Sequence, residues 1–173
     1  MKLFTFNWIK IAILNSLLVG NLSIFSPQNP ALSQTEVEAC KAAISNAKNR
    51  IQQVPYVVIQ QNWTRDNSER YLNLPPGRNI EYIFHLGGYR RNGRELITGI
   101  QTIGNSPQFM KSISQEIITK CSSVNSVSFG STFAPGCGIT WGIMNDGTIK
   151  EFTMVDDWEV RSPKLKWGES VCM

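Results

Sequence analysis

The sequence predicts a single α+β domain, in which an antiparallel sheet of about four to six strands carries two helices packed on one face. Three observations lead to this prediction. Two stretches place apolar residues at spacings of three and four, as amphipathic helices do. Several short stretches alternate apolar and polar residues or are rich in strand formers. No internal repeat or long linker divides the chain.

The start of the chain has the composition of an export signal. Lys2 and Lys10 make it positive, residues 11–25 are mainly apolar, and Ala31-Leu32-Ser33 offers small residues at the −3 and −1 positions of a cleavage site. The apolar stretch is shorter than the roughly 20 residues that span a bilayer. It therefore predicts a cleaved signal rather than a membrane anchor.

This interpretation sets the domain boundaries and the compartment. We predict a signal peptide over residues 1–33, cleaved after Ser33, and one domain over residues 34–173 that is secreted or periplasmic and keeps no membrane span. With 42% hydrophobic and 17% charged residues, the chain has the composition of a folded protein. Without the two lysines of the signal, 15 basic and 13 acidic residues remain, and so small an excess does not favour nucleic-acid binding.

The cysteines predict two disulfides. All four lie in the predicted domain, and an even number in an exported chain favours paired thiols. They are Cys40, Cys121, Cys137 and Cys172. Three pairings are possible, and spacing does not choose among them. Since there is no Cys-x-x-Cys and the single His85 has no histidine or cysteine near it in sequence, we expect no metal site and no cofactor.

The first element of the domain is a helix. Thr35 and Glu38 have the spacing of a capping box, and apolar residues recur from Val37 onward up to about Gln53, before Pro55. Residues 56–61 then predict a strand and residues 62–68 a polar loop.

A second strand follows the Pro75-Pro76-Gly77 turn. Residues 80–86 alternate, with Ile80, Tyr82, Phe84 and Leu86 on one face and Glu81, Ile83 and His85 on the other. Gly87 to Arg94 predicts a flexible basic connection, and residues 95–103 a further extended piece.

The second helix has a clear start, since Ser106 can cap it and Pro107 suits its first position. Its apolar stripe is Phe109, Met110, Ile113, Ile117 and Cys121.

A short strand around Val127 and then a hairpin complete the sheet. The hairpin strands, residues 139–144 and 148–155, flank Asp146-Gly147, which suits a two-residue turn. That turn places Trp141 opposite Phe152. On this register the core-facing residues are Ile139, Trp141, Ile143, Phe152 and Met154. A three-residue turn would shift the register and exchange the two faces.

One basic cluster is a candidate ligand-binding site. It consists of Tyr89, Arg90, Arg91 and Arg94, with glycines on both sides. Such a loop could hold a polyanion, for example an acidic polysaccharide or an envelope component. The alternative is a solvated hairpin tip.

The tryptophans outside the predicted core are a second candidate surface. If two of Trp63, Trp158 and Trp167 were exposed and adjacent, they could stack on sugars. Otherwise they cover the edge of the sheet or the core.

Catalytic candidates are few. His85 is the only histidine and Glu81, on the same strand face, lies about 13 Å along the strand, too far for contact. No serine sits in a Gly-x-Ser-x-Gly motif. Asp146 is explained by its turn, and Asp156 and Asp157 match no calcium-loop spacing. We therefore name no catalytic residue.

Several motifs resemble those of small secreted proteins of cyanobacteria, a family without an assigned activity. They are Asn105-Ser106-Pro107-Gln108-Phe109-Met110, Ile117-Ile118-x-x-Cys121, Val127-x-Phe129-Gly130, Asp146-Gly147-Thr148-Ile149-Lys150-Glu151-Phe152 and the junction Pro30-Ala31-Leu32-Ser33-Gln34. The resemblance implies an exported bacterial protein and carries over no catalytic residue.

Together these observations favour an exported, non-catalytic domain that acts as a binding or envelope-associated module. A small hydrolase of cell-wall or polysaccharide substrates is the second hypothesis. It needs two carboxylates about 5 to 10 Å apart, and Glu81 and Glu151 are the only strand carboxylates to nominate. The third hypothesis is an inhibitor or partner-binding protein that presents the loop from Gly87 to Arg94. The balance is against an enzyme, and the question stays open.

Overall fold

The structure is a computed structural model that describes residues 33–88, 90–91, 94–95, 97–156 and 164–172. In these residues the fold is α+β, as predicted, with three helices, a five-stranded sheet and three two-stranded sheets. Residues 1–32, which make up nearly all of the predicted signal peptide, lie outside the described residues. None of the described helices is long and apolar enough to cross a membrane.

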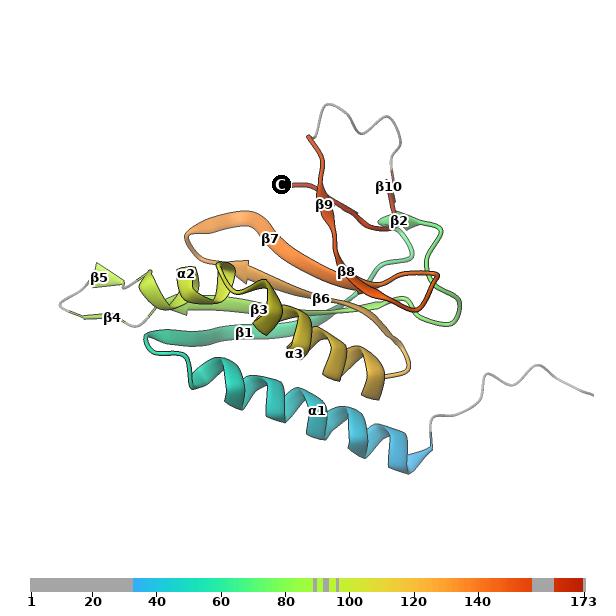
Figure 1. The fold of residues 1–173 in the computed structure, drawn as a ribbon, viewed down its shortest axis with the longest axis horizontal. Coiled ribbons are helices and arrows are strands. Elements are labelled where there is room, and N and C mark those ends of the chain that lie inside the picture. Colours follow the sequence, from blue (N-terminus) through green and yellow to red (C-terminus); the bar gives the residue numbers. More distant parts are fainter. Residues whose placement is uncertain (1–32, 89, 92–93, 96, 157–163, 173) are drawn as a thin grey trace, which may run out of the picture. The chain divides into compact units, whose positions relative to one another are not determined.

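The helices pack on one face of the five-stranded sheet (Figure 1). They are α1 (Gln34–Gln52), the short α2 (Thr98–Gly104) and α3 (Pro107–Lys120). The main core lies between them and the sheet, where burial of apolar side chains from both layers stabilises the fold. Its fully buried members include Ile51, Phe84, Ile113, Ile117 and Val127.

The sheet has the strand order β1-β3-β6-β7-β8. The strands are β1 (Val57–Asp66), β3 (Ile80–Gly88), β6 (Val124–Ser131), β7 (Ala134–Ile143) and β8 (Ile149–Glu151). The prediction of an antiparallel sheet holds for three of the four pairings, but β3 and β6 are parallel. Parallel neighbours need a crossover connection, and α2 and α3 supply it.

The alternation predicted for β3 is confirmed. Tyr82, Phe84 and Leu86 belong to the core beneath the helices. The residues between them face the other side of the sheet, which we call the open face. Glu81 and His85 on this side line a pocket described below.

A smaller apolar cluster covers part of the open face. Four short strands build this region: β2 (Tyr71–Leu72), β9 (Thr153–Met154), β10 (Leu165–Lys166) and β11 (Glu169–Ser170). They pair as β2 with β10 and β9 with β11, both parallel. The buried side chains of this cluster are Tyr71, Phe152 and Leu165. Gly142 of β7 lies beneath it, and a Cβ there would come within 2.4 Å of the Phe152 ring.

The predicted hairpin register is wrong by one residue. Asn145, Asp146 and Gly147 form a three-residue turn, in which Gly147 takes a φ of 78°. Trp141 therefore faces Glu151 rather than Phe152, and Ile143 faces Ile149. Because one residue of shift exchanges the faces, Phe152 leaves the main core for the open-face cluster, and Met154 is 54% exposed. Trp141 is buried in the main core, as predicted.

Two other predicted boundaries differ from the structure. The capping box of α1 was predicted at Thr35 and Glu38 but is formed by Ser33 and Glu36, two residues earlier. Both pairs have the same spacing of three residues. Residues 62–66, predicted as loop, continue β1 because they pair with β3 as far as Asp66 and Ile80.

Residues 98–103, predicted as extended, are helical in α2. Ile97, Ile100 and Ile103 are three residues apart, which is a helical spacing rather than the alternation of a strand. The predicted start of α3 is confirmed at Pro107, although the Ser106 side chain makes no capping hydrogen bond.

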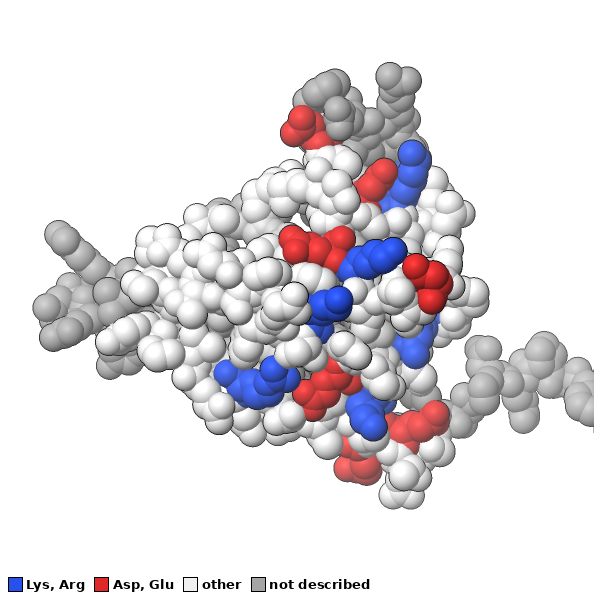
Figure 2. All heavy atoms as spheres, in the orientation of Figure 1, with Lys and Arg blue, Asp and Glu red and all other residues white. Residues whose placement is uncertain are grey.

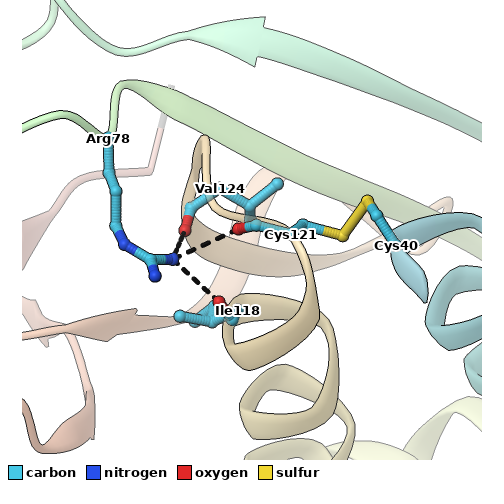
Figure 3. Close-up of a disulfide and its surroundings, with 5 residues drawn as sticks. All are labelled: Cys40, Arg78, Ile118, Cys121 and Val124. Carbon is cyan, nitrogen blue, oxygen red and sulfur yellow. Dashed lines mark hydrogen bonds between the residues drawn. A yellow bond between two sulfur atoms is a disulfide. The ribbon is translucent and has the colours of Figure 1, made fainter. Parts of the chain in front are cut away.

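Both predicted disulfides are present, and the structure decides their pairing: Cys40 with Cys121 and Cys137 with Cys172. The first joins α1 to the residue that ends α3 (Figure 3). Arg78 reinforces the same corner, since its Nη1 donates to the carbonyl oxygens of Ile118, Cys121 and Val124 at 2.7, 3.2 and 2.8 Å. Burial lowers the pKa of the Arg78 guanidinium. A cation at this place interacts favourably with the carboxyl-terminal end of α3, where the Ile118 carbonyl lies.

Candidate functional site

A pocket of about 170 Å³ that contains several charged and polar side chains lies on the open face. Its walls come from β1, β3, β6 and β7, and from Arg70 and the C-terminal residues Ser170 and Val171. Three glycines form part of the wall, namely Gly130 of β6 and Gly136 and Gly138 of β7, and Gly130 pairs with Gly138 across the strands. Because glycines have no side chain, space remains over the sheet at this point. We call this space the open-face pocket.

A buried carboxylate is the central feature of the open-face pocket. Glu81 is 1% exposed. Its Oε2 accepts hydrogen bonds from Arg65 Nη2 at 2.7 Å and from Arg65 Nε at 3.0 Å. Its Oε1 accepts a short hydrogen bond from the Ser128 hydroxyl, which lies 2.6 Å from the Thr140 hydroxyl. A buried charge needs such partners, and here cross-strand neighbours supply them.

Trp63, His85 and Arg70 are more accessible than Glu81. Trp63 is 42% exposed, and its ring centre lies 6.1 Å from that of His85. The guanidinium carbon of Arg70 lies 5.4 Å from the centre of the Tyr71 ring, and Arg70 has no carboxylate partner among the described residues. The pocket thus combines an aromatic face, an imidazole and an unpaired cation around a fixed ion pair.

The structure brings together some of the candidates from the sequence. His85 and Glu81 line the same pocket, although their strand spacing had argued against direct contact. Trp63 joins them from β1, where a loop had been predicted. Glu151 does not, because β6 and β7 lie between β8 and β3 and Glu151 pairs with Trp141 on the helix side of the sheet. Three strand spacings are about 14 Å, so these two glutamates cannot act as a pair.

Other candidates are separate or fall outside the described part. Trp167 packs edge-on against Tyr71 and Phe152, and its Nε1 donates to the Ile143 carbonyl at 2.8 Å, so it does not offer a stacking face with Trp63. Asp146 accepts hydrogen bonds from Thr148 in its turn, which lower the pKa of the carboxyl to about 2. Trp158, Tyr89 and the side chains of Arg90, Arg91 and Arg94 lie outside the described residues.

The backbone of the basic loop is partly described. Arg90 and Arg91 form β4 (Arg90–Arg91), which pairs antiparallel with β5 (Arg94–Glu95). The predicted flexible connection thus contains a short hairpin.

An apolar cavity of about 430 Å³ lies on the helix side of the same sheet end. Its walls come from α2, Leu86, Met110 and the ends of β6 and β7, and its rim carries the exposed side chains of Ile97, Phe133 and Met154. None of the described residues that line it is charged. On the side visible in Figure 2, acidic and basic side chains alternate over the rest of the surface, whereas the area over α2 and β7 is uncharged.

In the described part of the chain, no three His, Cys, Asp or Glu side chains gather in a group that could hold a metal ion. Comparisons of the chain with models of protein families, with curated proteins and with solved structures find no match. The function must therefore be inferred from the geometry of the site, and we use the open-face pocket and the apolar cavity for this purpose.

The residues of the open-face pocket that sequence reasoning missed include Arg65, Arg70, Ser128 and Thr140. A signal for two of them was present. Ser126, Ser128 and Gly130 alternate with Val127 and Phe129 in β6, and Gly138, Thr140 and Gly142 alternate in β7. Small and polar residues at a period of two in central strands indicate a sheet face that is not filled by a core.

Proposed function

We propose that the protein is an exported, non-catalytic binding module that holds a small, mainly apolar ligand in the apolar cavity. The observation that carries the proposal is the cavity itself. Its volume of about 430 Å³ falls within the range of small-molecule sites, roughly 300–1,000 Å³. Its walls are apolar, and Gln101, Asn105 and Ser131 supply a few polar groups that could orient a ligand.

The exposed rim supports a ligand of this kind. Ile97, Phe133 and Met154 are 40, 46 and 54% exposed, so the cavity leaves apolar surface in contact with water. Covering such surface is favourable by about 25 cal/mol per Å². A concave site of this size favours an acyl chain or a similar small molecule over a protein surface, because protein interfaces are larger and flatter.

Replacing Ile97 with glutamate is expected to weaken binding of a neutral apolar probe at least tenfold. The variant places a carboxylate at the rim, and an apolar ligand would have to desolvate it. The measurement is titration with N-phenyl-1-naphthylamine, whose fluorescence rises in apolar surroundings, followed by displacement with 1-decanol.

Thr102→Glu is the matched control, because Thr102 is exposed on the same helix and does not line the cavity. It should bind the probe as the wild type does, with an unchanged melting temperature in both variants. No fluorescence rise with the wild type, or equal affinity in the two variants, would contradict the proposal.

Export is a separate part of the proposal and has its own test. The sequence features of residues 1–33, the resemblance to secreted cyanobacterial proteins and the two disulfides support it. Mass spectrometry of the exported protein should give a chain that begins at Gln34 and gains four hydrogens on reduction. A mass that retains residues 1–33 refutes cleavage. A cut after Ser33 also removes the cap of α1, which costs about 1 kcal/mol.

A further inference from the structure

We propose that the open-face pocket is a second binding site, which takes one ring of an acidic sugar. The site adjoins the apolar cavity, with which it shares a wall at Gly130, Ser131, Ala134, Cys137 and Gly138. Its charged and aromatic side chains, however, project from the opposite face of the sheet. A carboxylate-bearing pyranose has a flat apolar face, several hydroxyl groups and one negative charge. The pocket offers a counterpart to each of these.

The aromatic counterpart is Trp63. Its side chain is 42% exposed although the strand around it is fully paired with β3, so the ring is held in place and still reaches water. Its partner across the strands is Ile83, and His85, two residues further along β3, lies diagonally from it with 6.1 Å between ring centres. Tryptophan is amphipathic and stacks on flat apolar surfaces at low entropic cost, since it has few rotamers. The C–H face of a pyranose is such a surface.

The charged counterpart is Arg70. The pocket wall contains Arg65, Arg70 and Glu81, and Glu81 is already paired with Arg65 at 2.7 Å. This leaves one excess positive charge at Arg70, which has no acidic partner in the part of the chain that the structure describes. A guanidinium binds a carboxylate through two parallel, charge-assisted hydrogen bonds. A neutral sugar has no carboxylate to accept them.

The counterpart of the hydroxyl groups is His85, which lies beside a hydrogen-bond network that is complete before any ligand binds. Arg65 and Ser128 fix the Glu81 carboxylate from two sides, and Thr140 extends this chain of hydrogen bonds. The His85 ring nitrogens have no hydrogen-bond partner among the described residues, and a Cβ on Gly130 would lie 3.6 Å from His85 Nδ1. The missing side chain of Gly130 therefore leaves the imidazole open to a ligand. A volume of about 170 Å³ limits the occupant to one small ring.

The test is calorimetric titration of the purified protein with trigalacturonate and with its neutral methyl ester. The wild type is expected to bind the acid at least tenfold more tightly than the ester. Arg70→Gln should remove this preference, and Trp63→Ala should weaken both ligands at least tenfold. Gly130→Val should abolish binding of both, because its methyl groups occupy the space beside His85.

Two controls distinguish binding in this pocket from attraction by surface charge and from binding in the apolar cavity. Lys41→Gln removes an exposed cation from α1 on the other side of the sheet and should change nothing, unless the acid binds by charge alone. Ile97→Glu should leave titration with trigalacturonate unchanged, so the two proposed sites can fail independently. The proposal is overturned if the wild type binds neither ligand, if Gly130→Val binds like the wild type, or if Lys41→Gln weakens binding as much as Arg70→Gln.

Discussion

Removing the disulfide between Cys40 and Cys121 is expected to lower the free energy of unfolding by about 4 kcal/mol. The bond closes a loop with a sequence separation of 81 and ties α1 to the end of α3. A cross-link restricts the unfolded chain, and the chain-entropy relation for a loop of this length gives roughly 4.5 kcal/mol. The measurement is urea unfolding of the Cys40→Ala/Cys121→Ala variant beside the wild type.

The second disulfide is the matched comparison. Cys137 and Cys172 are separated by 35 residues, so Cys137→Ala/Cys172→Ala should lose about 0.7 kcal/mol less by the same relation. The entropic account fails if the first variant loses less than about 1 kcal/mol, or if the second is the less stable of the two.

Arg65→Met is expected to destabilise the protein by about 3 kcal/mol. The substitution leaves the Glu81 carboxylate, 1% exposed, with the Ser128 hydroxyl as its remaining partner. Breaking a buried ion pair from one side costs about 3–5 kcal/mol, because the other charge stays buried without compensation. We expect the lower end of this range, since the Arg65 side chain is 38% exposed and water can approach it.

The diagnostic variant is the double replacement Arg65→Met/Glu81→Met. Two apolar side chains of similar volume leave no uncompensated charge, so the double variant should be more stable than Arg65→Met alone. Lys41→Met, which breaks the exposed pair with Glu38, should change stability by less than about 0.5 kcal/mol. Additive losses in the double variant would show that Glu81 is not held as a buried charge. Chemical unfolding at neutral pH measures all three.

The sequence pattern predicts helix starts and the two faces of a strand, because both depend on residues that are close together in the chain. Pro107 marks the start of α3, and the alternation of residues 80–86 assigns Phe84 to the core and Glu81 to the other face. These predictions succeed because the period of side-chain direction, 3.6 residues in a helix and two in a strand, can be recognised in a short stretch of sequence.

Predictions of features that depend on pairing with another segment of the chain were less successful. The hairpin register depended on whether Asp146-Gly147 closes a two-residue or a three-residue turn, and it was wrong by one residue. Trp63 looked like part of a loop, because only pairing with Ile83 makes residues 62–66 a strand. The open-face pocket could not be predicted either. It needs Arg65, Glu81, Ser128 and Thr140 on four neighbouring strands, and strand order is not a local property.

By itself the sequence determined the α+β class, the first and last helices of the described domain and the presence of two disulfides. These features follow from composition, hydrophobic periodicity and an even number of cysteines, which need no knowledge of tertiary contacts. Only the tertiary structure decided which cysteines pair, that β3 and β6 run parallel, and that Glu81, His85 and Trp63 share one pocket. The physical reason is that these features depend on contacts between segments far apart in the chain, and the packing of the whole core selects among the arrangements that local preferences allow.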